Sequence, residues 1–134
     1  MSPHLVSESA AYLLLQGDRT TAARALLAKD PDWRSDSFVL VEFSNVLATM
    51  VRDRLLAPGR AHDALGKAEQ IIEPGLHPAA HRASLTVAED LGVSVYDARF
   101  LVVAQMLSAR LVTEDAKLRR AAPNLTQSLE KALA

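Results

Sequence analysis

The sequence predicts an α/β protein in which helices cover both faces of a short, mostly parallel central sheet, a three-layer α/β/α arrangement. Short apolar segments such as 5–6 and 111–112 alternate with longer helical patterns, which is typical of a parallel sheet with crossover helices. The 134 residues are 49% hydrophobic and only 4% aromatic, so Leu, Val and Ala must build the core. Because no long linker or low-complexity tract divides the chain, we expect one domain over residues 1–134.

The first half of the chain predicts two strands and four helices. In order, they are a strand at 4–7, helices at 8–15 and 20–29, a strand at 33–34, a helix capped by Asp36 that runs to about Leu56, and a helix at 60–68. Ala and Leu dominate the first two helices and favour helix formation. Asp36 belongs to the preferred N-cap types, and the Pro58-Gly59 pair separates the last two helices.

The second half predicts two more strands and four more helices. In order, they are a strand at 71–74, helices at 78–90 and 94–107, a strand at 110–113, and helices at 115–121 and 126–133. Pro78 stands at the first-turn position that favours proline, and Gly92 ends that helix. Ser94 is suited to begin the next helix, and Pro123 closes the one after the last strand.

Composition and charge narrow the classes of function. Cysteine is absent, so there is no disulfide framework, thiolate metal site or cysteine nucleophile. The N-terminus lacks the pattern of a signal peptide, and no apolar run is long enough to span a membrane, so we expect a cytoplasmic protein. The formal net charge is −1, whereas dedicated nucleic-acid binders are mostly basic. A nucleic-acid partner would therefore need a bound metal and a local basic rim, for which Arg99, Arg119 and Arg120 are candidates.

Three acidic residues stand where a parallel sheet can bring them together. Asp97 lies in the first turn of the helix that starts at Ser94, and Asp115 follows the strand at 110–113. Sites in such sheets lie outside the carboxyl ends of the strands, and Glu42 can reach the same crevice from a neighbouring helix. Converging carboxylates repel one another unless a cation shares them, and Mg²⁺ or Mn²⁺ prefers oxygen ligands. We therefore predict a metal site.

Each acid also has a purely structural explanation. Asp97 completes a Ser-x-x-Asp pattern that resembles a capping box, and the helix dipole favours its charge. Asp115 is suited to cap the helix that follows it. Glu42 shares its helical face with mostly apolar residues and is costly to bury unpaired, but it can also point to solvent. An α/β regulatory domain whose acids only cap helices thus remains an alternative.

Three segments resemble, in order and spacing, the acidic motifs of PIN domains. They are Leu40-Val-Glu-Phe-Ser-Asn-Val-Leu, Ser94-Val-Tyr-Asp-Ala-Arg-Phe-Leu-Val-Val-Ala and Leu111-Val-Thr-Glu-Asp. The resemblance covers nearly the whole chain and is strongest to bacterial VapC-type toxins, which are metal-dependent ribonucleases inhibited by VapB-type antitoxins. It implies that Glu42, Asp97 and Asp115 are the catalytic acids and hold Mg²⁺ or Mn²⁺. It also implies that Asn45 and Thr113 support the site, and that the partners are RNA, an antitoxin and a second copy of the chain.

The segment around Ser7 departs from the family's first motif, a strand that ends in Asp. Ser7 stands at the position of that Asp, and a hydroxyl is a weak, neutral ligand for Mg²⁺. Glu8 points to the opposite face of an extended chain and can replace the acid only if the strand has already turned there. We therefore expect a toxin-type ribonuclease weakened at Ser7, in which Ser7→Asp raises metal affinity. The alternative is a non-catalytic PIN-like module that binds a protein.

Overall fold

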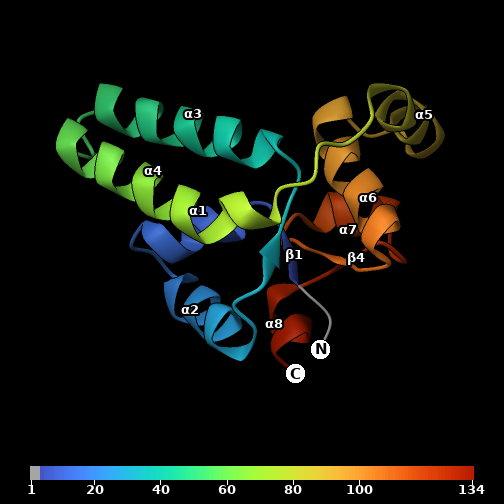
Figure 1. The fold of residues 1–134 in the computed structure, drawn as a ribbon, viewed down its shortest axis with the longest axis horizontal. Helices are drawn as coiled ribbons and strands as arrows, with labels where there is room; N and C mark the ends of the chain where they lie inside the picture. Colours follow the sequence, from blue (N-terminus) through green and yellow to red (C-terminus); the bar gives the residue numbers. More distant parts are fainter. Residues whose placement is uncertain (1–3) are drawn as a thin grey trace.

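The computed structural model describes residues 4–134, and a parallel sheet lies at its centre (Figure 1). The four strands are β1 (His4–Val6), β2 (Trp33–Arg34), β3 (Leu111–Val112) and β4 (Thr126–Gln127). Their order in the sheet is β2-β1-β3-β4, and every neighbouring pair is parallel. Val6 pairs with Val112, so the carboxyl ends of β1 and β3 lie side by side. The predicted parallel sheet is confirmed.

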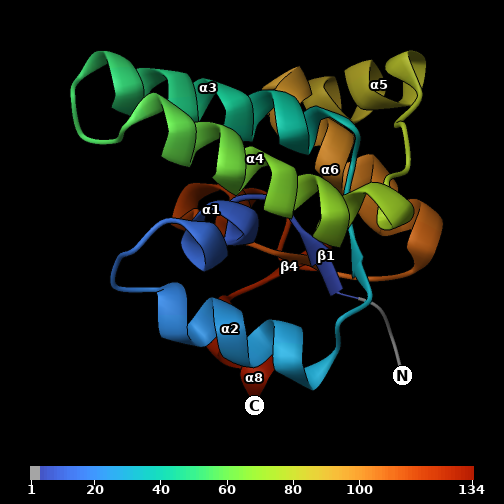
Figure 2. The same cartoon turned by 60° about the vertical axis from the view of Figure 1, so that its left-hand side comes forward.

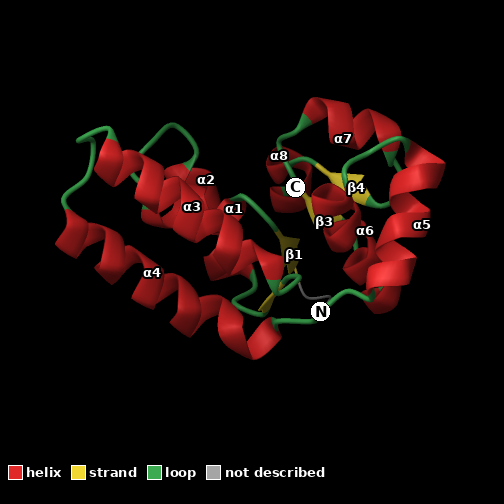
Figure 3. Ribbon diagram, turned by 90° about the horizontal axis from the view of Figure 1, so that it is seen from above, coloured by secondary structure: helices red, strands yellow, loops and turns green. Residues whose placement is uncertain are grey.

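Helices cover both faces of this sheet and complete the predicted three-layer α/β/α fold (Figures 2 and 3). They are α1 (Ser9–Leu14), α2 (Thr20–Lys29), α3 (Phe38–Arg52), α4 (Pro58–Ile72), α5 (His81–Leu91), α6 (Val95–Leu107), α7 (Ala116–Ala121) and α8 (Leu129–Leu133). Figure 3 shows α1, α2 and α8 on one side of the sheet and α6 on the other, with α5 packed on α6. The α3 and α4 helices form an antiparallel pair that extends away from the sheet (Figure 1).

One predicted strand is wrong, and the helix predicted at 126–133 is confirmed only over Leu129–Leu133. The strand predicted at 71–74 does not exist, because α4 continues to Ile72 and a 3₁₀ turn follows at Glu73–Gly75. The buried residues of α4 recur every three or four positions, which is a helical period, and they are Ala61, Ala64, Ala68 and Ile72. The outer strand β4 instead lies within the segment predicted as the helix 126–133. Both residues of β4 are polar, so no apolar segment marks this strand in the sequence.

Several helix boundaries also differ from prediction, and α4 already begins at Pro58 rather than at residue 60. The α3 helix ends at Arg52 rather than near Leu56, and Arg54 adopts a left-handed backbone with φ of 60° that turns the chain. The α5 helix begins at His81 rather than at Pro78, because the backbone of Ala80 is extended, with φ of −66° and ψ of 137°. The backbone N–H of Ala79 in this extended segment donates to the Asp36 carboxylate.

The interior contains one main apolar cluster and one satellite. The main cluster joins the sheet to α6, with Leu5, Val6, Leu101 and Leu111 at 0% exposure. The satellite joins α3 to α4 and contains Phe43, Leu47, Ala61, Ala64 and Ala68. Within residues 4–134, none of the helices combines the length and the apolarity that a membrane crossing requires.

A buried ion pair fixes α3 against α6. The Asp36 carboxylate has no exposed surface and accepts hydrogen bonds from the backbone N–H groups of Phe38 and Ala79, both at 2.8 Å. It also accepts two from the Arg99 guanidinium, at 2.8 and 3.1 Å. Because Asp36 stands just before α3 and Arg99 lies in α6, this pair sets the relative position of the two helices that carry Glu42 and Asp97.

Candidate functional site

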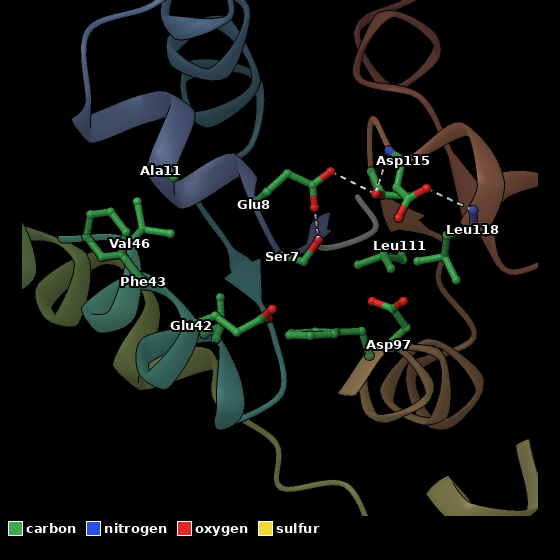
Figure 4. A pocket seen from close by; sticks show the side chains of 13 residues that line it. Ser7, Glu8, Ala11, Glu42, Phe43, Val46, Asp97, Leu111, Asp115 and Leu118 are labelled. Atoms are coloured by element: carbon green, nitrogen blue, oxygen red, sulfur yellow. Dashed lines mark hydrogen bonds between the residues drawn. The ribbon is translucent and has the colours of Figure 1, made fainter. Parts of the chain in front are cut away.

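Four carboxylates from four separate chain segments line one pocket at the carboxyl ends of β1 and β3 (Figure 4). They are Glu8 before α1, Glu42 in α3, Asp97 in α6 and Asp115 before α7. The pocket has a volume of about 140 Å³, and most of its other lining residues are apolar. The three acids predicted from the sequence therefore share one pocket, and a fourth acid joins them.

Glu8 is the acid that the sequence admitted to the site only on the condition that the strand had already turned before it. The β1 strand ends at Val6, and the Glu8 backbone is already helical, with φ of −71° and ψ of −10°. The chain has thus turned before Glu8, which points into the pocket (Figure 4). The signal was present, because the helix predicted from residue 8 already excluded an extended conformation there.

Hydrogen bonds hold the Glu8 carboxylate in place. One oxygen accepts from the Thr113 hydroxyl at 2.7 Å and from the backbone N–H of Glu114 at 2.6 Å. The Ser7 hydroxyl donates to the other oxygen. Ser7 therefore acts here as a donor to a carboxylate, and the pocket has an acidic side chain on this side despite the missing Asp.

Asp115 caps α7, as its structural explanation predicted. One of its carboxylate oxygens accepts from the backbone N–H of Leu118 at 3.1 Å. Its own backbone N–H donates to the hydroxyl of Thr113, which is almost fully buried. The Thr113 hydroxyl thus contacts both Glu8 and the Asp115 backbone, and it holds these two corners of the pocket together.

Asp97 lies in the first turn of α6, where Ser94 is the N-cap. The Ser94 hydroxyl accepts from the Asp97 backbone N–H at 3.0 Å, so the predicted cap is confirmed. The Asp97 side chain is half-buried and lines the pocket. Burial raises the pKa of its carboxyl group, the Ser94 hydrogen bond opposes this, and repulsion from Asp115 and Glu8 adds to it.

Glu42 projects from α3 on the side of the pocket opposite Glu8 (Figure 4). Partial loss of solvation raises the pKa of its carboxyl group to about 7, and repulsion from Asp97, Glu8 and Asp36 adds to the effect. Burial and repulsion from neighbouring carboxylates thus raise the pKa of both Glu42 and Asp97 in the absence of a cation.

The donor set fits a hard divalent cation. All four acids offer oxygen ligands, and no Lys, Arg or His is among the described residues that line the pocket. Within residues 4–134, however, no three of these side chains already stand at the spacing needed to hold one ion.

Other predicted residues lie outside the pocket. Asn45 is exposed on α3 and is not among the lining residues. Arg99 is committed to Asp36, so it is not the phosphate contact considered from the sequence. Arg119 donates to the Thr113 carbonyl at 2.7 Å and supports the end of β3, while Arg120 is exposed.

Comparison with known proteins gives the fold and the family. The crystal structure of PAE2754 from Pyrobaculum aerophilum is similar over 98% of this chain and 94% of that chain, with a TM-score of 0.78. The two sequences are 22% identical, so this likeness shows the fold alone. No curated protein gives a significant match. The family model of the PIN domain matches residues 9–123, a range that contains Glu42, Asp97 and Asp115. Because this match spans most of the sequence, the chain belongs to the PIN domain family.

Proposed function

We propose that this chain is a divalent-metal-dependent endoribonuclease and the toxin of a VapC–VapB-type pair. PIN domains are generally divalent-metal-dependent nucleases that act on RNA or DNA. The observation that supports the proposal is the single pocket lined by Glu8, Glu42, Asp97 and Asp115. The fourth acid, Glu8, supplies a carboxylate where Ser7 replaces the Asp of the family's first motif. Its presence favours a nuclease over a non-catalytic protein-binding module.

In this proposal Glu8, Asp97 and Asp115 hold Mg²⁺ or Mn²⁺, and Glu42 contributes directly or through a water molecule. When bound, such an ion lowers the pKa of water and offsets charge on the scissile phosphate. Hydrolysis adds the oxygen of water to phosphorus and breaks the bond to the leaving oxygen, which takes up a proton. Glu42 would accept the proton of the attacking water. Thr113 keeps Glu8 and the start of α7 in register.

The partner that we propose is a VapB-type antitoxin, and an apolar groove between α3 and α4 supports it. The groove has a volume of about 460 Å³, and its apolar lining includes Leu47, Val51, Ala61 and Leu65. An amphipathic helix is a suitable occupant for such a groove. A homodimer, a cytoplasmic location and a single domain over residues 1–134 complete the proposal.

The test is cleavage of single-stranded RNA with Mn²⁺ by the wild type and by Asp97→Asn. We expect the variant to lose activity by about 100-fold or more, because an uncharged amide is a poor metal ligand. Asp90→Asn is the matched control, since Asp90 is exposed on α5, and it should retain full activity. Chelation by EDTA should abolish cleavage. Wild-type activity that survives both EDTA and Asp97→Asn contradicts the proposal. A folded wild type that neither cleaves RNA nor binds Mn²⁺ favours the protein-binding module.

A further inference from the structure

Two aromatic rings stack between the helices that carry Glu42 and Asp97. The centroids of Phe38 and Tyr96 are 5.1 Å apart, and their planes differ by 24°. Phe38 begins α3 one turn before Glu42, and Tyr96 immediately precedes Asp97 in α6. The pair therefore bridges the two helices that place acids in the pocket.

Tyr96 is exposed to an extent that its packing does not explain. Sixty per cent of its surface is open to solvent, while Phe38 is half-buried. The relative position of α3 and α6 does not depend on this stack, because the buried Asp36–Arg99 ion pair already joins the two helices. Phe38 supports one face of the Tyr96 ring, which leaves a pre-oriented aromatic surface toward solvent.

We propose that Tyr96 stacks on an unpaired nucleobase next to the phosphate held at the carboxylate pocket. The inference rests on the proposed nuclease function and specifies its substrate as single-stranded RNA. Bases within a duplex are stacked on each other and cannot reach such a ring, whereas bases of single strands are commonly bound by stacking on aromatic side chains. Because the chain carries a net charge of −1, phosphate attraction alone is a weak source of affinity, and stacking supplies what charge does not.

The experiment measures RNA binding separately from cleavage. The probe is a short fluorescent single-stranded RNA, titrated by anisotropy with Ca²⁺ in place of Mn²⁺, and its integrity is checked on a gel. We expect Tyr96→Ala to weaken binding by about 5- to 100-fold, and Tyr96→Phe to restore it because the ring is kept. Met106→Ala is the matched control, since Met106 is 57% exposed on the same helix, and it should bind as the wild type does.

An abasic probe distinguishes stacking from a change elsewhere. When the central bases of the RNA are removed and the backbone is kept, wild type and Tyr96→Ala should bind equally. In Tyr96→Trp, RNA should quench the fluorescence of the new indole, while Trp33 is buried and should stay unaffected. Equal losses on the normal and abasic probes would overturn the inference, and so would unchanged RNA binding by Tyr96→Ala. If Tyr96→Ala binds RNA as the wild type does but no longer binds the antitoxin, Tyr96 belongs to a protein contact instead.

This design separates the inference from the proposed function. Binding that depends on Tyr96 while Asp97→Asn and the wild type are equally inactive with Mn²⁺ would keep the stacking site and remove the nuclease. Cleavage that depends on Asp97 but not on Tyr96, with unchanged KM, would keep the nuclease and remove the stacking site.

Discussion

The carboxylate pocket has two sides that hold their acids in different ways. One side, which we call the strand wall, consists of Glu8 and Asp115 at the ends of β1 and β3. Hydrogen bonds from Thr113, Glu114 and Leu118 fix these carboxylates. The other side, the helix wall, consists of Glu42 on α3 and Asp97 on α6. Among the described residues no N–H or O–H donor bonds the Glu42 carboxylate, and the pKa values of both helix-wall acids are raised.

The difference indicates that the two sides of the pocket would contribute to cation binding in different ways. Donors that are already in place stabilise ionised carboxylates and hold them in one position, so the strand wall is preorganised. The helix-wall acids have fewer hydrogen-bond donors and are repelled by neighbouring carboxylates, so the positive charge of a cation would stabilise their ionised forms most. If the proposed ion binds, Glu8 and Asp115 would offer it positioned ligands, and Glu42 and Asp97 would gain the most from its positive charge. The following predictions test this comparison.

The largest effect is expected from breaking the attachment of the helix wall. Arg99→Met leaves the buried Asp36 carboxylate without its cation, and we expect the free energy of unfolding to fall by about 3 kcal/mol. Urea denaturation measures this change. Arg82→Met is the matched control, since Arg82 is exposed on α5, and it should change stability by less than about 0.5 kcal/mol. Equal stability of the two variants would show that the ion pair does not anchor α3 to α6.

A smaller effect is expected from neutralising the strand wall. In Glu8→Gln the amide oxygen can still accept from Thr113 and Glu114, so the fold is kept while one charge is lost. We expect Mn²⁺ affinity, measured by calorimetry, to fall by about 10-fold or more. Glu89→Gln on the exposed side of α5 is the control. Unchanged Mn²⁺ affinity in Glu8→Gln would exclude Glu8 from the metal site.

The same titration tests Ser7→Asp. The sequence alone led us to expect a gain in metal affinity from this substitution. Because the Ser7 hydroxyl donates to Glu8, an Asp there removes that donor and sets a like charge beside an existing carboxylate. We now expect no gain, and a clear increase in Mn²⁺ affinity would show that Glu8 does not fill the missing position.

The smallest effect concerns pH and the helix wall. With its pKa raised to about 7 in the folded state, Glu42 ionises first in the unfolded chain, near its ordinary value of 4.5. Stability of the metal-free protein should therefore fall as pH rises from 4.5 to 7 and stay low above that window. Glu42→Gln removes this loss, so in EDTA it should melt about 1–3 °C above the wild type at pH values over 7. Below pH 4.5 the two proteins should melt together.

Mn²⁺ provides the internal control for this pH prediction. Above pH 7 the ion should raise the melting temperature of the wild type more than that of Glu42→Gln, because it compensates the charge that the variant lacks. A metal-free wild type whose melting temperature rises from pH 4.5 to 7 relative to that of Glu42→Gln would contradict the raised pKa.

Features that depend on residues close together in the sequence could be predicted, and features that depend on distant residues were missed more often. Ser94 and Asp97 are three residues apart in one helix, so the cap of α6 and the acid in its first turn could be predicted from spacing alone. The alternation of short apolar segments with longer helical segments was enough to predict the parallel sheet. The strand β4 was missed because its two residues, Thr126 and Gln127, are polar. The end of α4 was missed although Ala68 and Ile72 continue the helical period of its buried residues.

By itself the sequence determined the fold class, the Ser94 cap and three of the four acids, because helix caps and hydrophobic periods are properties of neighbouring residues. Only the tertiary structure decided that Thr113 holds Glu8 from 105 positions away and that Arg99 pairs with Asp36 rather than with a phosphate. The physical reason is that a carboxylate accepts hydrogen bonds from any N–H or O–H group that lies within reach in the folded protein. Which donor arrives is settled by packing between strands and helices that are far apart along the chain.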